Sequence, residues 1–329
     1  MNLKLTLSTL ALFTAASLTA QFSNFNTQRN WSMNKKEILF GGGATQFLGD
    51  LGGQDGIGKD YSLADMNFSK TSYNFLLGYR YRFHPVLAVT GTFNFGQFKA
   101  SDEETDNPAR HLRKIEVRSI LLNLTARLEY IVYQNEKVGK RNNLPGLKGM
   151  KDKNVQVFVF TGIGGAYFNP KGFFPSDRFV ITDDGQQVFG TDEWVSLQPL
   201  RTEGQGYPGG SDKYRRVTAT IPFGFGYRLG INRMWRIMID ATYFKTFTDY
   251  MDDVSTVYYD YEQNGITASP SQIYHADPSW NGIFGDGQQR GDNEKDAFFY
   301  LNVGVTKNVT YKSYVRGKPI KWKGVRAKF

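Results

Sequence analysis

From Glu37 onward the chain alternates between apolar and polar residues with a period of two, in long segments separated by polar connections. Between Ser72 and Phe83, every second residue is apolar or aromatic, namely Tyr73, Phe75, Leu77, Tyr79, Tyr81 and Phe83. This is the period of an extended strand with one apolar and one polar face. We therefore expect eight strands, at 37–48, 71–83, 86–100, 116–132, 155–168, 215–229, 234–248 and 297–308.

These segments are long enough to cross a membrane, since a tilted strand needs only about 9 to 11 residues to do so. The connections at 49–70, 101–115, 169–214 and 249–296 are long, whereas those at 84–85 and 230–233 are short. Short inner turns and long outer loops are typical of outer-membrane barrels. We predict an all-β fold, a transmembrane antiparallel up-and-down β-barrel of about eight strands with long extracellular loops and periplasmic termini. A soluble β-sandwich is the alternative, because period two does not distinguish lipid from a protein core.

The N-terminal segment has the pattern of a secretory signal. Lys4 precedes the apolar stretch 5–16, and Ser17, Leu18 and Thr19 lead to Ala20 and Gln21, with Leu18 larger than the small residue usually found three positions before a cleavage site. We predict cleavage after Ala20, with an uncleaved membrane anchor as the alternative. The chain then divides into a signal peptide (1–20), an outer-membrane barrel with an N-terminal periplasmic lead (21–308) and a basic periplasmic tail (309–329).

Composition and charge add a basic end to this picture. The chain has no cysteine, which excludes disulfides, iron–sulfur clusters and a lipid-modified cysteine. The formal net charge is +9, but an exported chain does not ordinarily meet nucleic acid, so we expect outer-membrane lipids and protein partners instead. The predicted periplasmic side is basic at 134–154 and in the tail, whereas the connection 249–296 is acidic.

The tail is predicted to dock onto an acidic periplasmic partner, with charge governing encounter and aromatic side chains providing specificity. A solvated tail, or one bound to anionic headgroups, is the alternative. The candidate docking residues are Lys312, Tyr314, Arg316, Lys318, Lys321, Trp322, Lys323, Arg326, Lys328 and Phe329.

Charged residues also occur on the predicted inner face of the strands. In an eight-stranded barrel, side chains nearly fill the interior. We expect a network of paired ions that closes the lumen, with an ion-selective pore as the alternative. The residues of this predicted network are Glu37, Arg80, Arg82, Arg127, Glu129, Arg228, Arg236 and Asp240.

Enzymatic and cofactor chemistry has little support in the sequence. The glycine clusters at 41–43, 162–165 and 224–226 lie inside strand patterns rather than between a strand and a helix, so they are not predicted to be phosphate-binding loops. Ser255, His275 and Asp253 share one connection, but that alone does not make a hydrolase triad. We expect a non-enzymatic protein without a cofactor or catalytic residues.

The acidic element after the seventh segment is a candidate extracellular loop motif, made by Asp249, Tyr250, Asp252 and Asp253. Its carboxylates have the chemistry of Ca²⁺ ligands, but their spacing follows no regular ligand pattern. A hydrated loop, or one packed through Tyr250 and Met251, is the favoured interpretation.

Four stretches resemble the PorG-like outer-membrane barrels of Bacteroidota. They are Glu37–Gly43 followed by Phe47–Leu51, then Tyr79–Phe83, and the element Thr248–Ser255, where the family pattern has Leu in place of Met251. The resemblance implies a component of the type IX secretion system, associated with a periplasmic ring that is built by a lipoprotein and its ring partner. In gliding species, it also implies a contribution to motility.

Two functions of different classes follow. The first is a structural accessory of a secretion machine, and the second is a free-standing surface or transport barrel. The tail discriminates between them, because a barrel that only displays loops or passes solutes has no need of a dense basic segment.

Overall fold

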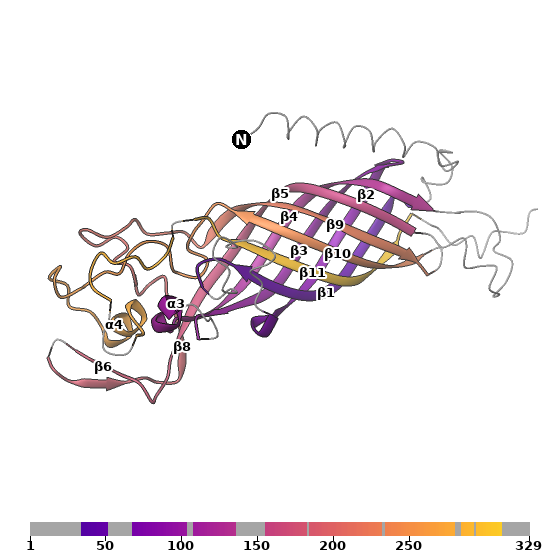
Figure 1. The fold of residues 1–329 in the computed structure, drawn as a ribbon. Coiled ribbons are helices and arrows are strands. Elements are labelled where there is room, and N and C mark those ends of the chain that lie inside the picture. The colour runs from indigo at the N-terminus through magenta and orange to yellow at the C-terminus, as the bar shows by residue number, and fades with distance from the viewer. Residues whose placement is uncertain are drawn as a thin grey trace, which may run out of the picture.

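Eight long antiparallel strands form a closed barrel in the computed structural model of the chain, which describes residues 34–51, 68–103, 108–135, 155–182, 184–231, 234–279, 284–292 and 294–310. The barrel strands are β1 (Lys36–Leu48), β2 (Ser72–His84), β3 (Leu87–Ser101), β4 (Glu116–Asn135), β5 (Val155–Phe174), β9 (Val217–Gly230), β10 (Trp235–Thr246) and β11 (Ala297–Asn308). Each pairs with its neighbour in sequence, and β1 closes the sheet against β11 (Figure 1). The predicted eight-stranded up-and-down barrel is confirmed.

The two ends of the barrel differ in the length of their connections. At one end, called the turn end, lie the tight connections after His84 and Gly230, the start of β1 and the last residues of β11. At the other end, called the loop end, lie the connections 49–71, 102–115, 175–216 and 247–296. The strand bounds agree with the expected segments except that β4 and β5 are longer, because they continue to pair with each other and β5 also pairs with β8 (Glu193–Ser196).

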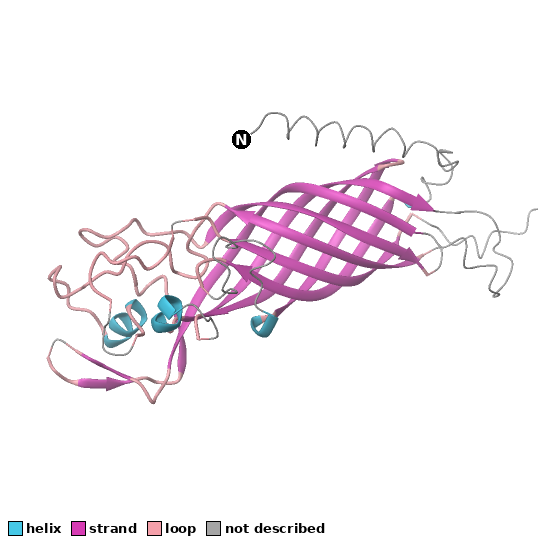
Figure 2. Cartoon of the chain, viewed as in Figure 1, coloured by secondary structure: helices cyan, strands magenta, loops and turns pink. Residues whose placement is uncertain are grey.

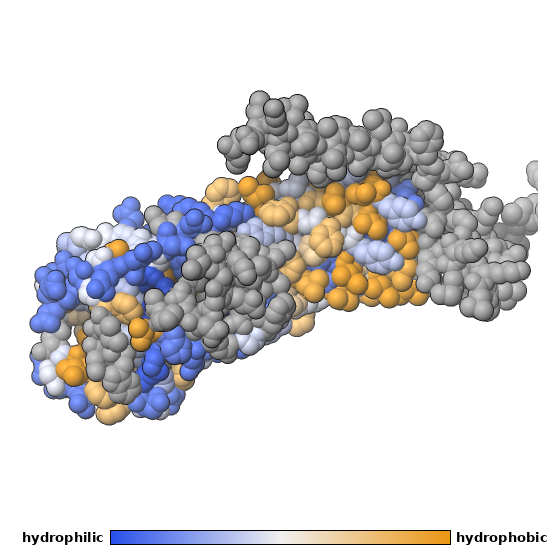
Figure 3. All heavy atoms as spheres, viewed as in Figure 1, coloured by the Kyte–Doolittle hydropathy of each residue, from blue (hydrophilic) through white to orange (hydrophobic). Residues whose placement is uncertain are grey.

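The alternation of the sequence becomes an apolar exterior around a polar interior. In β2 the six predicted outward residues are exposed, whereas Asn74, Arg80 and Arg82 point inward and are buried. Apolar side chains cover much of the visible barrel wall, and hydrophilic side chains gather at the loop end (Figure 3). A soluble β-sandwich buries its apolar face, so the exposed apolar wall and the polar lumen indicate a barrel that spans a membrane.

This assignment of faces predicts that Leu124→Arg destabilises the inserted barrel by about 2 to 4 kcal/mol. Leu124 is 65% exposed on the outer wall, where lipid would have to accommodate the arginine. The control is Ile181→Arg, which changes an equally exposed apolar side chain outside the barrel and should cost less than about 0.5 kcal/mol. Unfolding in urea, followed by heat-modifiable gel mobility, measures both, and equal losses would contradict the assignment of faces.

The connections at the loop end have secondary structure of their own (Figure 2). A small hairpin is formed by β6 (Phe179–Ile181) and β7 (Gln187–Phe189), and two short helices are α3 (Pro108–Arg113) and α4 (Pro270–Ala276). A single 3-10 turn, η4 (Phe68–Lys70), precedes β2. We call the described residues of 175–216 and 247–296, together with α3, the cap. In the described part of the chain, no helix has the length and apolarity needed to cross a membrane.

Candidate functional site

The barrel interior contains a layer of buried ions close to the turn end. All eight residues of the predicted network lie in it with at most 3% of their surface exposed, namely Glu37, Arg80, Arg82, Arg127, Glu129, Arg228, Arg236 and Asp240. They come from five strands, β1, β2, β4, β9 and β10. The strand register brings them together: Glu37 lies opposite Arg80, and Arg80 opposite Thr90.

Glu129 is the centre of this ion layer. Its carboxylate accepts hydrogen bonds from Arg80 Nε at 2.8 Å and from both terminal nitrogens of Arg228 at 2.9 and 3.0 Å. The hydroxyl of Thr90 donates to it at 2.6 Å. Arg80 also reaches Glu37 at 3.0 Å. One carboxylate therefore holds side chains from three other strands across the lumen.

The remaining members extend the layer around the barrel. Arg127 pairs with Asp240 at 2.8 Å, and the amide of Asn302 donates to the same carboxylate at 3.0 Å. Arg236 lies 3.4 Å from Glu37. Arg82 donates to the carbonyl oxygen of Pro85 and to the side chain of Gln134 at the turn end.

Aromatic rings fill the space between these ions. The guanidinium of Arg228 lies 3.8 Å from the centroid of the Phe158 ring, and that of Arg127 lies 4.3 Å from the Phe160 ring. Gly226 lies beneath Phe158, where any Cβ would collide with the ring. The glycines of β9 thus make room for bulky inward neighbours, as their position inside a strand pattern predicts.

A second layer closes the loop end of the barrel. Six inward aromatic side chains, which we call the aromatic plug, belong to one buried cluster: Phe47, Phe98, Phe168, Phe244, Phe298 and Tyr300. Phe244 stacks on Phe298 at 4.5 Å, and Phe47 stacks on Phe98 at 4.6 Å. With the ion layer below and the aromatic plug above, the interior is occupied at both ends.

The cap continues this buried cluster beyond the barrel. Met251 and Val254, which lie beside the residues of the loop motif, are fully buried in the same cluster as the plug. Tyr250 stacks on Tyr214 with 4.7 Å between ring centroids. Of the interpretations of this motif, the structure therefore supports packing through Tyr250 and Met251.

Arg290 holds the cap together through buried contacts. Its guanidinium donates to Glu203 at 3.1 Å, to the carbonyl oxygen of Asp253 at 2.7 Å and to that of His275 at 3.1 Å. Glu203 in turn accepts the amide of Ser255 at 2.9 Å. One buried cation thus links the segments around 203, 253 and 275.

The four residues of the loop motif have different environments. The Asp253 carboxylate accepts hydrogen bonds from the hydroxyls of Thr202 and Tyr214, and burial raises its pKa to about 6 although Arg290 opposes the shift. Asp249 accepts from the hydroxyl of Ser255 at 2.6 Å, and burial raises its pKa to about 7. Burial, with Asp50 adding to it, raises the pKa of Asp252 well above its usual range. Asp253 therefore has hydrogen-bond partners of its own, which differ from those of Asp249 and Asp252.

The residues Ser255, His275 and Asp253 do not form a catalytic triad. Ser255 donates to Asp249, and the His275 ring packs against Phe174 and Tyr274. Burial, reinforced by Arg290, lowers the pKa of His275 to about 3, so its ring is neutral. The hydrogen bonds and ring contacts in the described part of the cap are those of a packed structure rather than of a nucleophile and base.

The candidate docking residues from Lys312 to Phe329 lie outside the described residues, as do the predicted signal peptide and most of 134–154. The structure does place the start of the tail. The amide of Lys36 donates to the Thr310 hydroxyl at 2.7 Å, so the chain leaves the barrel at the turn end.

The aromatic plug and Arg290 are features that the sequence analysis missed. A signal for the plug exists in β3, where Phe98 has the same parity as the inward residues Thr90, Thr92 and Asn94. An aromatic residue in the polar register of a barrel strand therefore indicates packing inside the lumen. Arg290 carries no comparable signal, because it is one of two basic residues in a long acidic connection.

Comparisons with known proteins assign neither a family nor a function to the chain. No family model matches the sequence, and no curated protein is similar to it.

Among solved structures, one similar protein is the attachment invasion locus protein of Yersinia pestis, in complex with a heparin analogue. It is 13% identical with a TM-score of 0.31, and the match covers 83% of this chain and 99% of that protein. Neisserial surface protein A is 6% identical with a TM-score of 0.32, covering 83% and 96%. The transport unit of the Escherichia coli autotransporter AIDA-I is 9% identical with a TM-score of 0.21, covering 89% and 96%. The identities and scores are low, and no functional conclusion follows from them.

The fold and the site together define a class of protein. This is an eight-stranded transmembrane β-barrel of the outer-membrane type, with an apolar outer wall, an interior filled by ions and aromatic rings, and a folded cap.

Proposed function

We propose that the protein is a non-enzymatic outer-membrane component of the type IX protein secretion system, a PorG-like barrel that associates with the periplasmic ring lipoprotein and its ring partner. In this role it supports protein export and, in gliding species, motility. The observation that carries the proposal is the element Thr248–Ser255, on which the resemblance mainly rests. Met251, Asp252, Asp253 and Val254 of this element are fully buried, so it is a packed part of the cap rather than an exposed surface loop.

The filled lumen favours a structural role over transport. Ion pairs span the lumen near the turn end, and the aromatic plug occupies it near the loop end. A solute would have to displace both layers, and breaking a buried ion pair costs about 3 to 5 kcal/mol. A barrel built in this way serves as an anchor with one surface on each side of the membrane.

The proposed orientation places the cap outside the cell and the turn end in the periplasm, as short and long connections are arranged in outer-membrane barrels. The contact of Lys36 with Thr310 lies at the turn end, where the described part of the chain ends. In this orientation the tail faces a periplasmic ring, and its charge acts over a Debye length of about 8 Å at physiological salt.

Truncation after Lys312 tests the docking role. We expect normal barrel insertion, shown by heat-modifiable mobility, together with loss of ring co-purification and impaired cargo export. Trp322→Ala should weaken co-purification without removing any charge, because the aromatic anchor supplies specificity. Lys213→Ala is the control, since it removes an exposed base at the loop end. Unchanged co-purification and export in both tail variants would sink the proposal.

Reconstitution separates the proposal from the alternative of a free-standing transport barrel. The filled lumen predicts no sustained conductance across a planar bilayer and no swelling of liposomes in permeant solutes. Steady channels of porin size would instead favour the transport alternative.

A further inference from the structure

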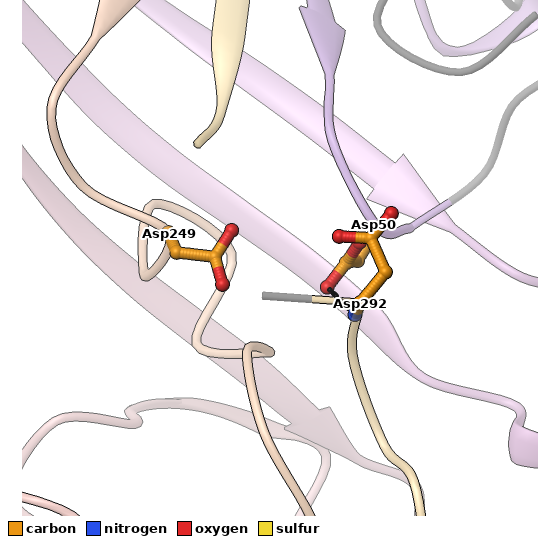
Figure 4. A group of neighbouring side chains, drawn as sticks. All are labelled: Asp50, Asp249 and Asp292. Atoms are coloured by element: carbon orange, nitrogen blue, oxygen red, sulfur yellow. Dashed lines mark hydrogen bonds between the residues drawn. The ribbon is translucent and has the colours of Figure 1, made fainter. Parts of the chain in front are cut away.

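Five carboxylates converge where the cap joins the barrel. They come from three neighbouring segments: Asp50 follows β1, Asp249 and Asp252 follow β10, and Asp292 and Asp296 precede β11. One oxygen each from Asp50, Asp249 and Asp292 lies within 4.8 Å of the other two. In Figure 4 the Asp249 carboxylate is directed across the gap toward Asp50 and Asp292, and a hydrogen bond of 3.0 Å joins the Asp292 amide to Asp50.

Three of these side chains are buried and have a carboxylate oxygen without a partner. Asp249 is 2% exposed, and Asp252 and Asp296 are fully buried. Within the described chain, Asp249 Oδ1, Asp252 Oδ2 and Asp296 Oδ1 receive no hydrogen bond. A buried polar atom with no partner is costly, and a buried charge is more so. These oxygens point to a ligand that would satisfy them.

Two cations of the described residues act on the buried carboxylates of the cluster. Arg113 acts on Asp252, but its guanidinium is also bound to Asp102 at 2.9 Å. Lys295 acts on Asp249 and is exposed to solvent. Burial and the neighbouring carboxylates raise the pKa of Asp296, as they do for Asp249 and Asp252.

We propose that Asp50, Asp249 and Asp292 bind a Ca²⁺ ion, with Asp252 and Asp296 completing the negative charge around it. Ca²⁺ takes six to eight oxygen ligands at about 2.3 to 2.6 Å, so ligands on opposite sides of the ion are about 5 Å apart. The spacing of the three oxygens fits this geometry. The ion ties the end of β1 to the segments that leave β10 and enter β11, and so fastens the cap to the barrel rim.

Calorimetric titration of CaCl₂ into the chelator-treated, full-length mature protein in detergent tests the site. We expect one bound ion per chain with a dissociation constant of about 10⁻⁴ to 10⁻³ M, the range of extracellular calcium modules. Ca²⁺ should also raise the cap's resistance to protease. Asp249→Asn and Asp292→Asn should each weaken binding by more than about tenfold, because even partners outside the first ligand shell contribute that much.

Glu294→Gln is the matched control, because it neutralises an exposed carboxylate in the same segment outside the cluster, and it should bind Ca²⁺ as the wild type does. Without Ca²⁺, the cap of Asp249→Asn should resist protease at least as well as that of the wild type, because the substitution removes one of the repelling charges. Asp292, being exposed, provides the second variant should Asp249→Asn fail to fold. No saturable binding in the wild type, or undiminished binding in both folded asparagine variants, would overturn the proposal.

Discussion

Glu129→Gln is expected to destabilise the barrel by about 3 to 5 kcal/mol, the cost of leaving buried charges without their partner. The substitution keeps the size of the side chain and removes only its charge. Arg80 and Arg228 would lose the carboxylate that they share, and Arg127, 4.0 Å away, would lose part of its compensation. The ion layer already holds five arginines against three carboxylates, so the change leaves five against two.

Equilibrium unfolding in urea, with the protein in detergent micelles, measures this loss. Glu116→Gln is the matched control, because Glu116 lies exposed at the other end of the same strand, and it should change stability by less than about 0.5 kcal/mol. A double variant that also replaces Arg228 by Met should recover part of the loss, because it removes one of the unpaired cations. Equal stability of Glu129→Gln and Glu116→Gln would show that the ion layer does not hold the strands together.

Arg290→Ala is expected to open the cap while the barrel stays inserted. The side chain is buried, and its removal takes one donor each from the Glu203 carboxylate and from the carbonyl oxygens of Asp253 and His275. Breaking a buried ion pair by removing one partner costs about 3 to 5 kcal/mol. The cost falls on the cap, because every hydrogen-bond acceptor named here lies outside the barrel strands.

Limited proteolysis followed by mass spectrometry detects this opening. Cleavage between residues 254 and 290 should become faster in Arg290→Ala, while the heat-modifiable mobility of the barrel is retained. Arg215→Ala, which removes an exposed arginine from the end of the cap, is the control and should leave the cleavage rate unchanged. A cap that remains as resistant as the wild type would contradict the role given to Arg290.

The sequence predicts the barrel because period two is a local signal. Within each strand, the alternation itself indicates which residues face inward and which outward, as in β2, where Tyr79 faces outward and Arg80 inward. β4 and β5 extend further than the pattern predicts because their last residues are set by strand pairing, Asn135 with Val155 and Phe174 with Glu193 for example. That pairing joins positions far apart in sequence and leaves no periodic pattern.

For the ion layer, the sequence predicts which side chains point inward but not which of them pair. Parity placed Glu129 inside the barrel, but its partners Arg80 and Arg228 are 49 and 99 residues away. Choosing them among five inward arginines requires the strand register and the barrel tilt. The acidic connection presented a further difficulty, because charge alone indicates a hydrated loop, whereas Asp252 and Asp253 are fully buried. Asp253 is held by Thr202, Tyr214 and Arg290, which come from two different connections.

The shared cluster of Met251 and Val254 with Phe298 and Tyr300 limits how this barrel can be re-engineered. A small barrel whose loops only cover it can be trimmed to its strands or fitted with foreign epitopes. Here, deletion of 249–256 would remove side chains that pack on the aromatic plug and would let water reach its apolar rings at the loop end of the lumen. Grafts are better placed at the tip of the β6–β7 hairpin, whose Ile181 and Phe189 are exposed and lie outside that cluster.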